Sequence, residues 1–271
     1  MSTVASIQRL PRAAHTGRVT QLRVVLSEWT KLHSLRSTRW SLLAGFLLTI
    51  ALPILFAAVT SSHWGTMSAH ERADRHPLDI ALAGVNVSQL AIAVLGVLVI
   101  TGEYSTGMIR ASFSAVPKRL PVLWAKTAVF GVVSFLLMLP PVLIAFFASQ
   151  AILSRHHILQ ISFSHAGVAR SVIGGAIYLM LVGVFALGIG AMVRNTAGGI
   201  ATFAAIFFVI PPLMNILPTR WNNAISQYLP QIFSLTHGAH SLDPWPGGLL
   251  FVGYCALTLA IAAVLLVRRD T

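Results

Sequence analysis

The sequence predicts an all-α membrane protein with six transmembrane helices, and three observations lead to this fold class. Only 10% of the 271 residues are charged, whereas 56% are hydrophobic. A soluble domain carries about 25% charged residues, so this chain has too few to cover a water-soluble surface. Six apolar stretches are each about 20 residues long, the length that a helix needs to cross a bilayer. Most basic residues flank these stretches, as is typical at membrane surfaces.

The six predicted spans divide the chain into a polar N-terminal region, 1–39, and a transmembrane domain, 40–271. The spans are predicted at 40–62, 80–101, 122–153, 168–193, 197–218 and 247–267. The third span is long, and the Pro140-Pro141 pair near its middle predicts a kink or a break. Only the three residues 194–196 separate the fourth span from the fifth, which predicts a tight hairpin.

The distribution of Lys and Arg predicts which side of the membrane each connection faces. Fourteen of the 19 basic residues lie in the N-terminal region, in the stretch 102–126, at Arg194 and in the C-terminal tail. The other connections hold only Arg72, Arg75, Arg155, Arg170 and Arg220. Because connections rich in Lys and Arg stay on the cytoplasmic side, both termini are expected in the cytoplasm. The chain is therefore expected to be a multi-pass protein of the plasma membrane.

The segment 19–35 is predicted to form an amphipathic helix on the cytoplasmic surface of the membrane. Its apolar residues recur with the helical period, at Val19, Leu22, Val25, Leu26, Trp29, Leu32 and Leu35. A basic amphipathic helix next to a first span is typical of a helix that lies in the lipid interface. It can act as an anchor or transmit motion from a cytoplasmic partner to the first span, and the pattern alone does not separate these roles.

A polar stretch, GEYSTGMIRASFSAVPKRLP at 102–121, lies between the second and third spans. Gly102 is expected to end the second span, because glycine is favoured just after a helix, and Pro121 suits the first turn of the third. The residues 103–116 are predicted to form a short helix with two apolar stripes, which can pack against the span ends and offer apolar surface to a partner. The alternative is an ordinary loop in which Lys118 and Arg119 set the topology.

Three segments of the chain together carry a family resemblance. They are LSEWTKLHSLRSTRWSLL, ITGEYSTGMIRASFSAVPKRLPVLWAK and GIGAMVRNTAGGI. These segments resemble the permease subunits of type-2 ABC transporters, particularly actinobacterial ones, and the resemblance extends over nearly the whole chain. It implies that the stretch 102–121 is a short cytoplasmic coupling helix that docks into a groove of a separate ATPase subunit, and that 19–35 is the connecting helix. The implied coupling residues are Glu103, Tyr104, Gly107, Met108, Ile109 and Arg110.

Two pairs of charged residues have expected roles near the membrane surface. Glu103 and Arg110 are seven residues apart and share a helix face, so they are expected to pair with complementary charges on the ATPase. Simple solvation at the membrane surface is the alternative for both. Lys126 and Arg170 are each near a span end, from which their long side chains can extend to the membrane surface.

The resemblance also implies a substrate pathway, because in this family two permease copies meet and their second and fifth spans help to line it. The candidate pathway residues are therefore Asn86 and Gln89 in the second span and Phe203 and Phe207 in the fifth. Interhelical hydrogen bonds for the amides and lipid contacts for the rings are the alternative. The fifth span also carries a ridge of small residues at four-residue spacing, which favours close helix packing. These residues are Ala197, Ala201 and Ala205.

The sequence lacks the motifs of several other function classes. No GxxxxGK[ST] occurs, so the chain has no P-loop for ATP and is not expected to be an enzyme. No acidic residue falls in a span interior, which counts against a proton- or sodium-coupled carrier. There is no GxSxG or HExxH motif. His237 and His240 are three residues apart, which suits one helix face, but no carboxylate or cysteine has a convincing spacing to complete a metal site, and the single cysteine, Cys255, lies in an apolar run. The excess of basic residues follows the topology rule, so no nucleic-acid partner is expected.

The expected function is that of the membrane-spanning subunit of an ATP-driven ABC exporter. ATP and Mg²⁺ would bind to the separate ATPase, and this chain itself is expected to hold no cofactor, catalytic residue or metal. The other expected partners are the lipid bilayer and a second permease copy, in a homodimer or a paralogous heterodimer. Two alternatives stay open, a non-transporting scaffold or sensor that retains the permease fold and, less favoured, a secondary carrier.

Overall fold

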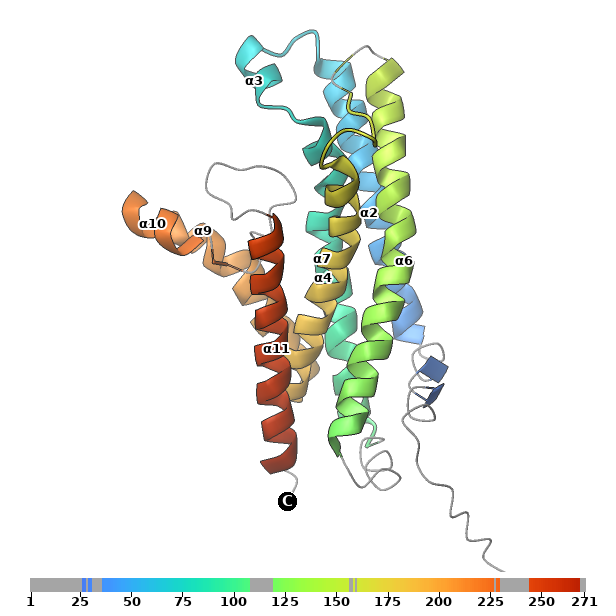
Figure 1. The fold of residues 1–271 in the computed structure, drawn as a ribbon, viewed down its shortest axis with the longest axis vertical. Helices are drawn as coiled ribbons and strands as arrows, with labels where there is room; N and C mark the ends of the chain where they lie inside the picture. The colour runs from blue at the N-terminus through green and yellow to red at the C-terminus, as the bar shows by residue number, and fades with distance from the viewer. Residues whose placement is uncertain are drawn as a thin grey trace, which may run out of the picture.

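The computed structural model describes residues 26–27, 29–30, 36–107, 119–155, 158, 160–226, 228–229 and 244–268, and all regular structure within these ranges is helical. Six helical segments there are long and apolar enough to cross a membrane (Figure 1). They are α2 (Arg36–His63), α4 (Pro77–Ser105), α6 (Arg119–Arg155), α7 (Val168–Val193), the run α8 (Thr196–Ala204), η1 (Ala205–Val209) and α9 (Ile210–Met214), and α11 (Pro244–Arg268). The predicted all-α, six-span fold class is confirmed, and the chain is a multi-pass membrane protein.

The helix boundaries agree with the predicted spans to within a few residues, with two differences in their interiors. α6 is one continuous helix that contains Pro140 and Pro141, so the predicted alternative of a break does not occur. The fifth span is not a uniform α-helix, because α8 passes into the π-helical turn η1 before α9 begins. A π-turn inserts an extra residue per turn and changes which side chains face the bundle. The amphipathic helix predicted over 19–35 lies mostly outside the described residues.

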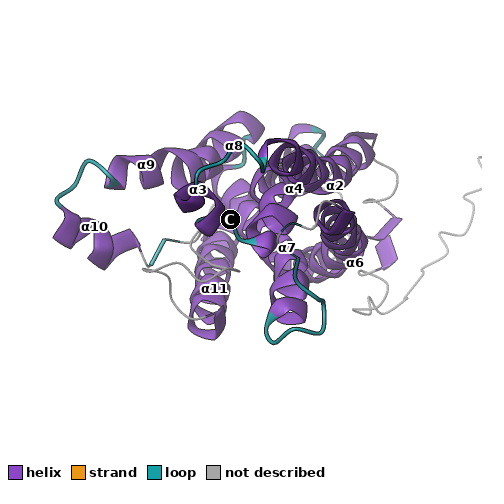
Figure 2. Cartoon of the chain, turned by 90° about the horizontal axis from the view of Figure 1, so that it is seen from above, coloured by secondary structure: helices purple, strands orange, loops and turns teal. Residues whose placement is uncertain are grey.

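α7 occupies the centre of the bundle. It packs against α4, α6, α8 and α11, and 83% of its most apolar stretch is buried (Figure 2). Its sequence explains this position, because no charged residue occurs between Arg170 and Arg194 and the helix is apolar on every side. A helix with this pattern is suited to burial on all faces. α2 packs on the outside of this core, against α4 and α6.

Glycines bring the backbones of the core helices into contact. A Cβ atom added to Gly96 of α4 would lie only 2.3 Å from the carbonyl oxygen of Gly183 in α7. A Cβ added to Gly84 would lie 2.4 Å from the carbonyl oxygen of Thr49 in α2. In a bilayer, helices associate through close van der Waals contact, which small residues permit. The α2–α4 and α4–α7 contacts therefore depend on glycines in α4 and α7.

The fifth span lies at the edge of the bundle, where only 17% of its most apolar stretch is buried. The ridge of Ala197, Ala201 and Ala205 is exposed, so the described helices of this chain do not pack on it. The last part of this span, α9, and the following helix α10 (Thr219–Ser226) extend away from the bundle, as Figures 1 and 2 show. α10 falls in the connection before the last span.

The connections between the spanning helices lie at two opposite ends of the bundle. The lower end in Figure 1 holds the start of α2, the end of α4, the start of α6, the α7–α8 turn and the C-terminal end of α11. The upper end holds the short helix α3 (Ala69–Ala73), the α6–α7 connection and the start of α11. One end therefore holds the connections that are rich in Lys and Arg, and the other end holds connections that are poor in them, as the distribution of basic residues predicted.

Candidate functional site

The second span continues past the residue that was expected to end it. α4 runs to Ser105, and Gly102 lies inside its last turn, where its carbonyl accepts hydrogen bonds from the N–H and hydroxyl of Thr106. Gly107 follows with φ +71°, a left-handed conformation that glycine adopts without strain and that commonly follows a helix end. The prediction that Gly102 ends the span is therefore wrong, and Glu103 belongs to the span helix.

The six implied coupling residues consequently fall in two groups. Glu103 and Tyr104 lie in the last turn of α4, and Gly107 forms the turn just after it. Met108, Ile109 and Arg110, together with most of the short helix predicted over 103–116, lie outside the described residues.

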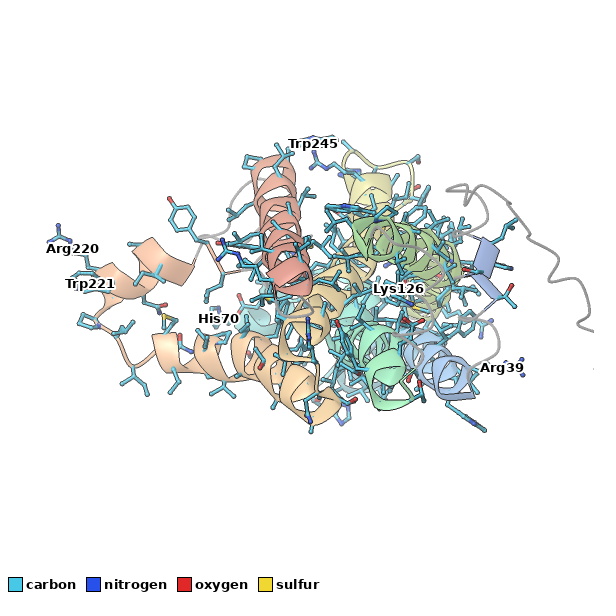
Figure 3. The ribbon with its side chains drawn as sticks, turned by 90° about the horizontal axis from the view of Figure 1, so that it is seen from below. Arg39, His70, Lys126, Arg220, Trp221 and Trp245 are labelled. Carbon is cyan, nitrogen blue, oxygen red and sulfur yellow. The ribbon has the colours of Figure 1, made fainter. Side chains whose placement is uncertain are left out.

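Glu103 forms an ion pair with Lys126 of α6. The Lys126 Nζ donates to the Glu103 Oε1 at 2.9 Å, and the two side chains are only 3% and 5% exposed, respectively. Figure 3 shows Lys126 inside the bundle, whereas Arg39 and Arg220 lie at its margin. The expectation that Lys126 extends to the membrane surface is wrong, because a buried carboxylate neutralises it in place. Glu103 likewise faces its own chain, where it is covered from solvent.

The burial of this pair makes each partner depend on the other. Removing two charges from water costs several kcal/mol per ion, which the mutual attraction offsets only while both are present and well aligned. The pair joins the last turn of α4 to the second turn of α6. In the sequence these two helices precede and follow the segment 108–118, so the pair holds together the two helix ends that this segment connects.

Tyr104 and Arg194 form a second link at the same end. The Arg194 guanidinium lies 5.1 Å from the centroid of the Tyr104 ring, a distance suited to a cation–π interaction. Arg194 ends α7 in the left-handed conformation, with φ 57°, and its N–H donates to the carbonyl of Gly190. Its guanidinium also donates to the Leu265 carbonyl of α11 at 3.4 Å. The α7–α8 turn is thereby connected to both α4 and α11.

A pair of threonines completes the set. The Thr196 hydroxyl at the start of α8 donates to the Thr101 hydroxyl of α4 at 2.8 Å, and Thr101 in turn donates to the carbonyl of Val97. We call the residues of these three links the basal cluster. They are Thr101, Glu103, Tyr104, Lys126, Arg194 and Thr196. The basal cluster joins α4, α6, α11 and the α7–α8 turn at the end of the bundle that carries the segment 108–118.

Three of the four candidate pathway residues belong to one buried network. Gln89 is 6% exposed, and its Oε1 accepts a hydrogen bond of 2.5 Å from the Tyr178 hydroxyl of α7. The rings of Phe203 and Phe207 are stacked, with centroids 4.3 Å apart. Phe251 of α11 lies between the two groups, with its ring centroid 5.7 Å from that of Tyr178 and 6.3 Å from that of Phe207.

Asn86 is separate from this network. It lies one turn before Gln89 on α4, but its side chain is exposed on the outer face of the bundle beside Val87 and Leu90. Gln89 therefore forms an interhelical hydrogen bond, as the alternative interpretation of the two amides predicted. The alternative for the two rings was contact with lipid, and it does not apply to Phe203 and Phe207, because both are buried. The described helices of this chain therefore leave the Asn86 amide uncovered.

Sequence reasoning did not assign the partners that hold these residues. Lys126 was expected to reach the membrane surface, although a lysine four residues after the start of a predicted span is a signal for a buried counter-charge. Between Ser171 and the end of α7, Tyr178 is the one residue with a hydroxyl, and this could have identified it as the partner of an amide. Thr101 and Thr196 carry no comparable signal, because single threonines are common in spans.

No group of three His, Cys, Asp or Glu side chains in the described part of the chain is placed to hold a metal ion. Cys255 is buried in α11, where its thiol contacts the Leu181 carbonyl of α7 at 3.4 Å. Comparison with protein-family models and with curated proteins gave no match.

Proposed function

We propose that this chain is the transmembrane permease subunit of an ATP-driven ABC exporter, coupled to a separate ATPase that binds ATP and Mg²⁺. The observation that carries the proposal is the position of the basal cluster. The segment 108–118 belongs to the stretch 102–121 that resembles a coupling helix. It connects two helices that Glu103 and Lys126 join through a buried ion pair. Force applied to this segment by a partner would move α4 and α6 together instead of separating them.

The proposed mechanism is alternating access driven by the ATPase. ATP-dependent closure of the ATPase displaces the segment 108–118, and the basal cluster carries this displacement to α4, α6 and the α7–α8 turn. α4 also holds Gln89, which is bonded to Tyr178 in the core, so the motion reaches the middle of the membrane. The ATPase drives the change by binding more tightly to one of the two states, since only differential affinity shifts such an equilibrium.

A second permease copy is part of the proposal. The ridge of Ala197, Ala201 and Ala205 is exposed on the fifth span, and small residues at this spacing favour helix–helix contact in a bilayer. The exposed amide of Asn86 supports the same view, because a polar group that faces lipid is less favourable than one that faces a partner or a water-filled pathway. The second copy is either identical or a paralogue.

The charge distribution supports an ATP-driven transporter over an ion-coupled carrier. Among the described residues, Glu71 and Asp74 lie outside the spans, Asp79 lies in the first turn of α4, and Glu103 in its last turn is paired with Lys126. None of these carboxylates lies in the middle of a span, where proton- or sodium-coupled carriers use them. The proposed orientation places the basal cluster and both termini in the cytoplasm.

The test is co-purification of the whole chain with an ABC ATPase encoded beside it, followed by ATPase measurements in lipid nanodiscs. Reversal of Glu103 would break the buried pair, so the charge reversal is placed in the segment itself, as Arg110→Glu. We expect wild type to form a complex and Arg110→Glu to weaken it about tenfold, which corresponds to the loss of one charged contact. The matched control is Arg220→Glu, an exposed arginine on α10, which extends away from the bundle.

Three outcomes would contradict the proposal. A chain that binds no ATPase, or one that binds equally well with Arg110→Glu and Arg220→Glu, favours the scaffold or sensor. Transport driven by a proton gradient without ATP favours the secondary carrier.

A further inference from the structure

A groove runs along the outside of the bundle between α7 and α11. Its volume is about 380 Å³. Apolar side chains form most of its lining, namely Ile173, Ile177, Leu181, Leu249 and Val252. The groove opens outward, because its rim residues Leu249 and Trp245 are 70% and 72% exposed. Gly174 and Gly248 also line it and leave space that larger side chains would fill.

The length of the groove corresponds to one leaflet of a bilayer. It extends along α7 from Arg170 to Leu181, which are eleven residues apart and therefore about 16 Å apart along the helix axis. The hydrocarbon core of a bilayer is about 30 Å thick, so each leaflet contributes about 15 Å. An acyl chain with its head group at Arg170 would end near Leu181.

The mouth of the groove is positively charged. Arg170 lies there in the first turn of α7, and Trp245 lies in the first turn of α11, where Figure 3 labels it at the end of the helix. Both helices begin at this end, so their N-terminal N–H groups and dipoles also favour an anion. No acidic side chain is among the described residues that line the groove. The tryptophan is of the type that occupies the head-group level of a membrane.

We propose that the groove between α7 and α11 binds one anionic phospholipid, with an acyl chain along the apolar lining and the phosphate at Arg170. The charge at the mouth selects an anionic head group, and the leaflet-long apolar lining selects a hydrocarbon chain. A packed apolar helix from another protein would cover Arg170 without supplying the negative charge that this end favours. The lipid site does not depend on the proposed exporter activity.

The test uses native mass spectrometry of the whole purified chain, released from nanodiscs that contain equal amounts of phosphatidylglycerol and phosphatidylcholine with the same acyl chains. Wild type is expected to retain one phosphatidylglycerol in preference to phosphatidylcholine. Arg170→Gln is expected to lower this preference about tenfold, since a guanidinium–phosphate contact is lost, and Arg170→Lys is expected to keep most of it. Arg220→Gln, an exposed arginine on α10, is the control and should change nothing.

A second pair of variants tests the acyl-chain part of the groove. Gly248→Leu places a side chain in the groove and is expected to remove the retained lipid. Gly253→Leu is the matched control on the same helix, because a Cβ there meets nothing within 4 Å. Size-exclusion chromatography of each variant checks that it folds, and Arg170→Gln provides the test should Gly248→Leu fail this check.

Three results would overturn the proposal. Equal retention of the two lipids by wild type would show ordinary lipid coverage. Equal effects of Arg170→Gln and Arg220→Gln would show general surface attraction. Retention by the folded Gly248→Leu variant would place the bound lipid elsewhere.

Discussion

Lys126 Nζ lies 2.9 Å from Glu103 Oε1, and this buried ion pair joins the end of the second span to the start of the third. The pair is made within one chain, so it does not require a cytoplasmic partner. It occurs at the ends of the two helices that the same connecting segment joins. Its consequences can be tested by variants that leave that segment unchanged.

The first prediction concerns the stability that this pair confers. Glu103→Gln or Lys126→Met alone should lower the free energy of unfolding by about 3–5 kcal/mol, because each leaves one buried charge without its counter-charge. The double variant should recover most of this loss, since neither charge remains. Thermal unfolding in detergent micelles measures all three, with the exposed Arg220→Gln as control. Additive losses in the double variant would show that the two residues act independently.

The second prediction concerns the contact between α4 and α7. Gly96→Ala should destabilise the protein by about 1–3 kcal/mol, because its new methyl group would lie 2.3 Å from the Gly183 carbonyl oxygen and the helices must separate. Gly253→Ala is the control, because an added Cβ there meets nothing and alanine favours the helix. The same unfolding measurement applies. A Gly96→Ala variant as stable as Gly253→Ala would contradict the close contact.

The third prediction concerns the buried hydrogen bond between Tyr178 and Gln89. Tyr178→Phe leaves the Gln89 Oε1 without this donor and should lower stability by about 1–3 kcal/mol. Combining it with Gln89→Leu should reduce the loss, because the unpaired amide is then removed. If Tyr178→Phe instead leaves stability unchanged while ATPase stimulation or transport falls, Gln89 acts in a pathway and the bond has no structural role.

The fourth prediction is a pH dependence confined to α3. The backbone N–H of Ser68 donates to the Glu71 carboxylate at 2.7 Å, and with the Ser68 hydroxyl it lowers the pKa of Glu71 below its ordinary value of 4.5. A carboxyl whose pKa is lowered by folding stabilises the helix above its ordinary pKa and loses this contribution as the pH falls through the lowered value. Protection of the α3 amides from hydrogen exchange, corrected for intrinsic rates, should therefore decrease below about pH 4.

The variant Glu71→Gln provides the control for this fourth prediction. Glutamine can form the same capping box with Ser68 but does not titrate. Protection of α3 in this variant should be independent of pH over the same range. A decrease equal to that of wild type would assign the effect to another group.

The positions of the spans could be predicted from the sequence, because length and hydropathy determine which segments enter a bilayer. The fourth span was predicted at 168–193, and α7 has these same bounds. The polar residues at its two ends give this boundary without any tertiary contact. The end of the second helix could not be predicted in this way. The helix continues past Gly102 to Ser105, and in this last turn Glu103 pairs with Lys126 of another span.

The faces of the spans could not be predicted in the same way. Lipid and protein core are both apolar, so hydrophobicity does not distinguish a side chain that faces one from a side chain that faces the other. Phe203 and Phe207 are buried against other rings, whereas Phe208 is exposed on the same span. The π-turn η1, which no residue type signals, also changes the direction of the side chains along this span.

The contact between Gly96 and Gly183 gives α4 the geometry of a lever. Glu103 lies seven residues from Gly96 toward the basal cluster, and Gln89 lies seven residues from it in the other direction. Each arm is therefore about 10 Å long. A tilt of α4 about this contact moves Gln89 by as much as it moves Glu103, and in the opposite direction. Because the two distances are equal, a tilt about Gly96 would reverse the direction of a displacement of Glu103 at Gln89 without increasing its size.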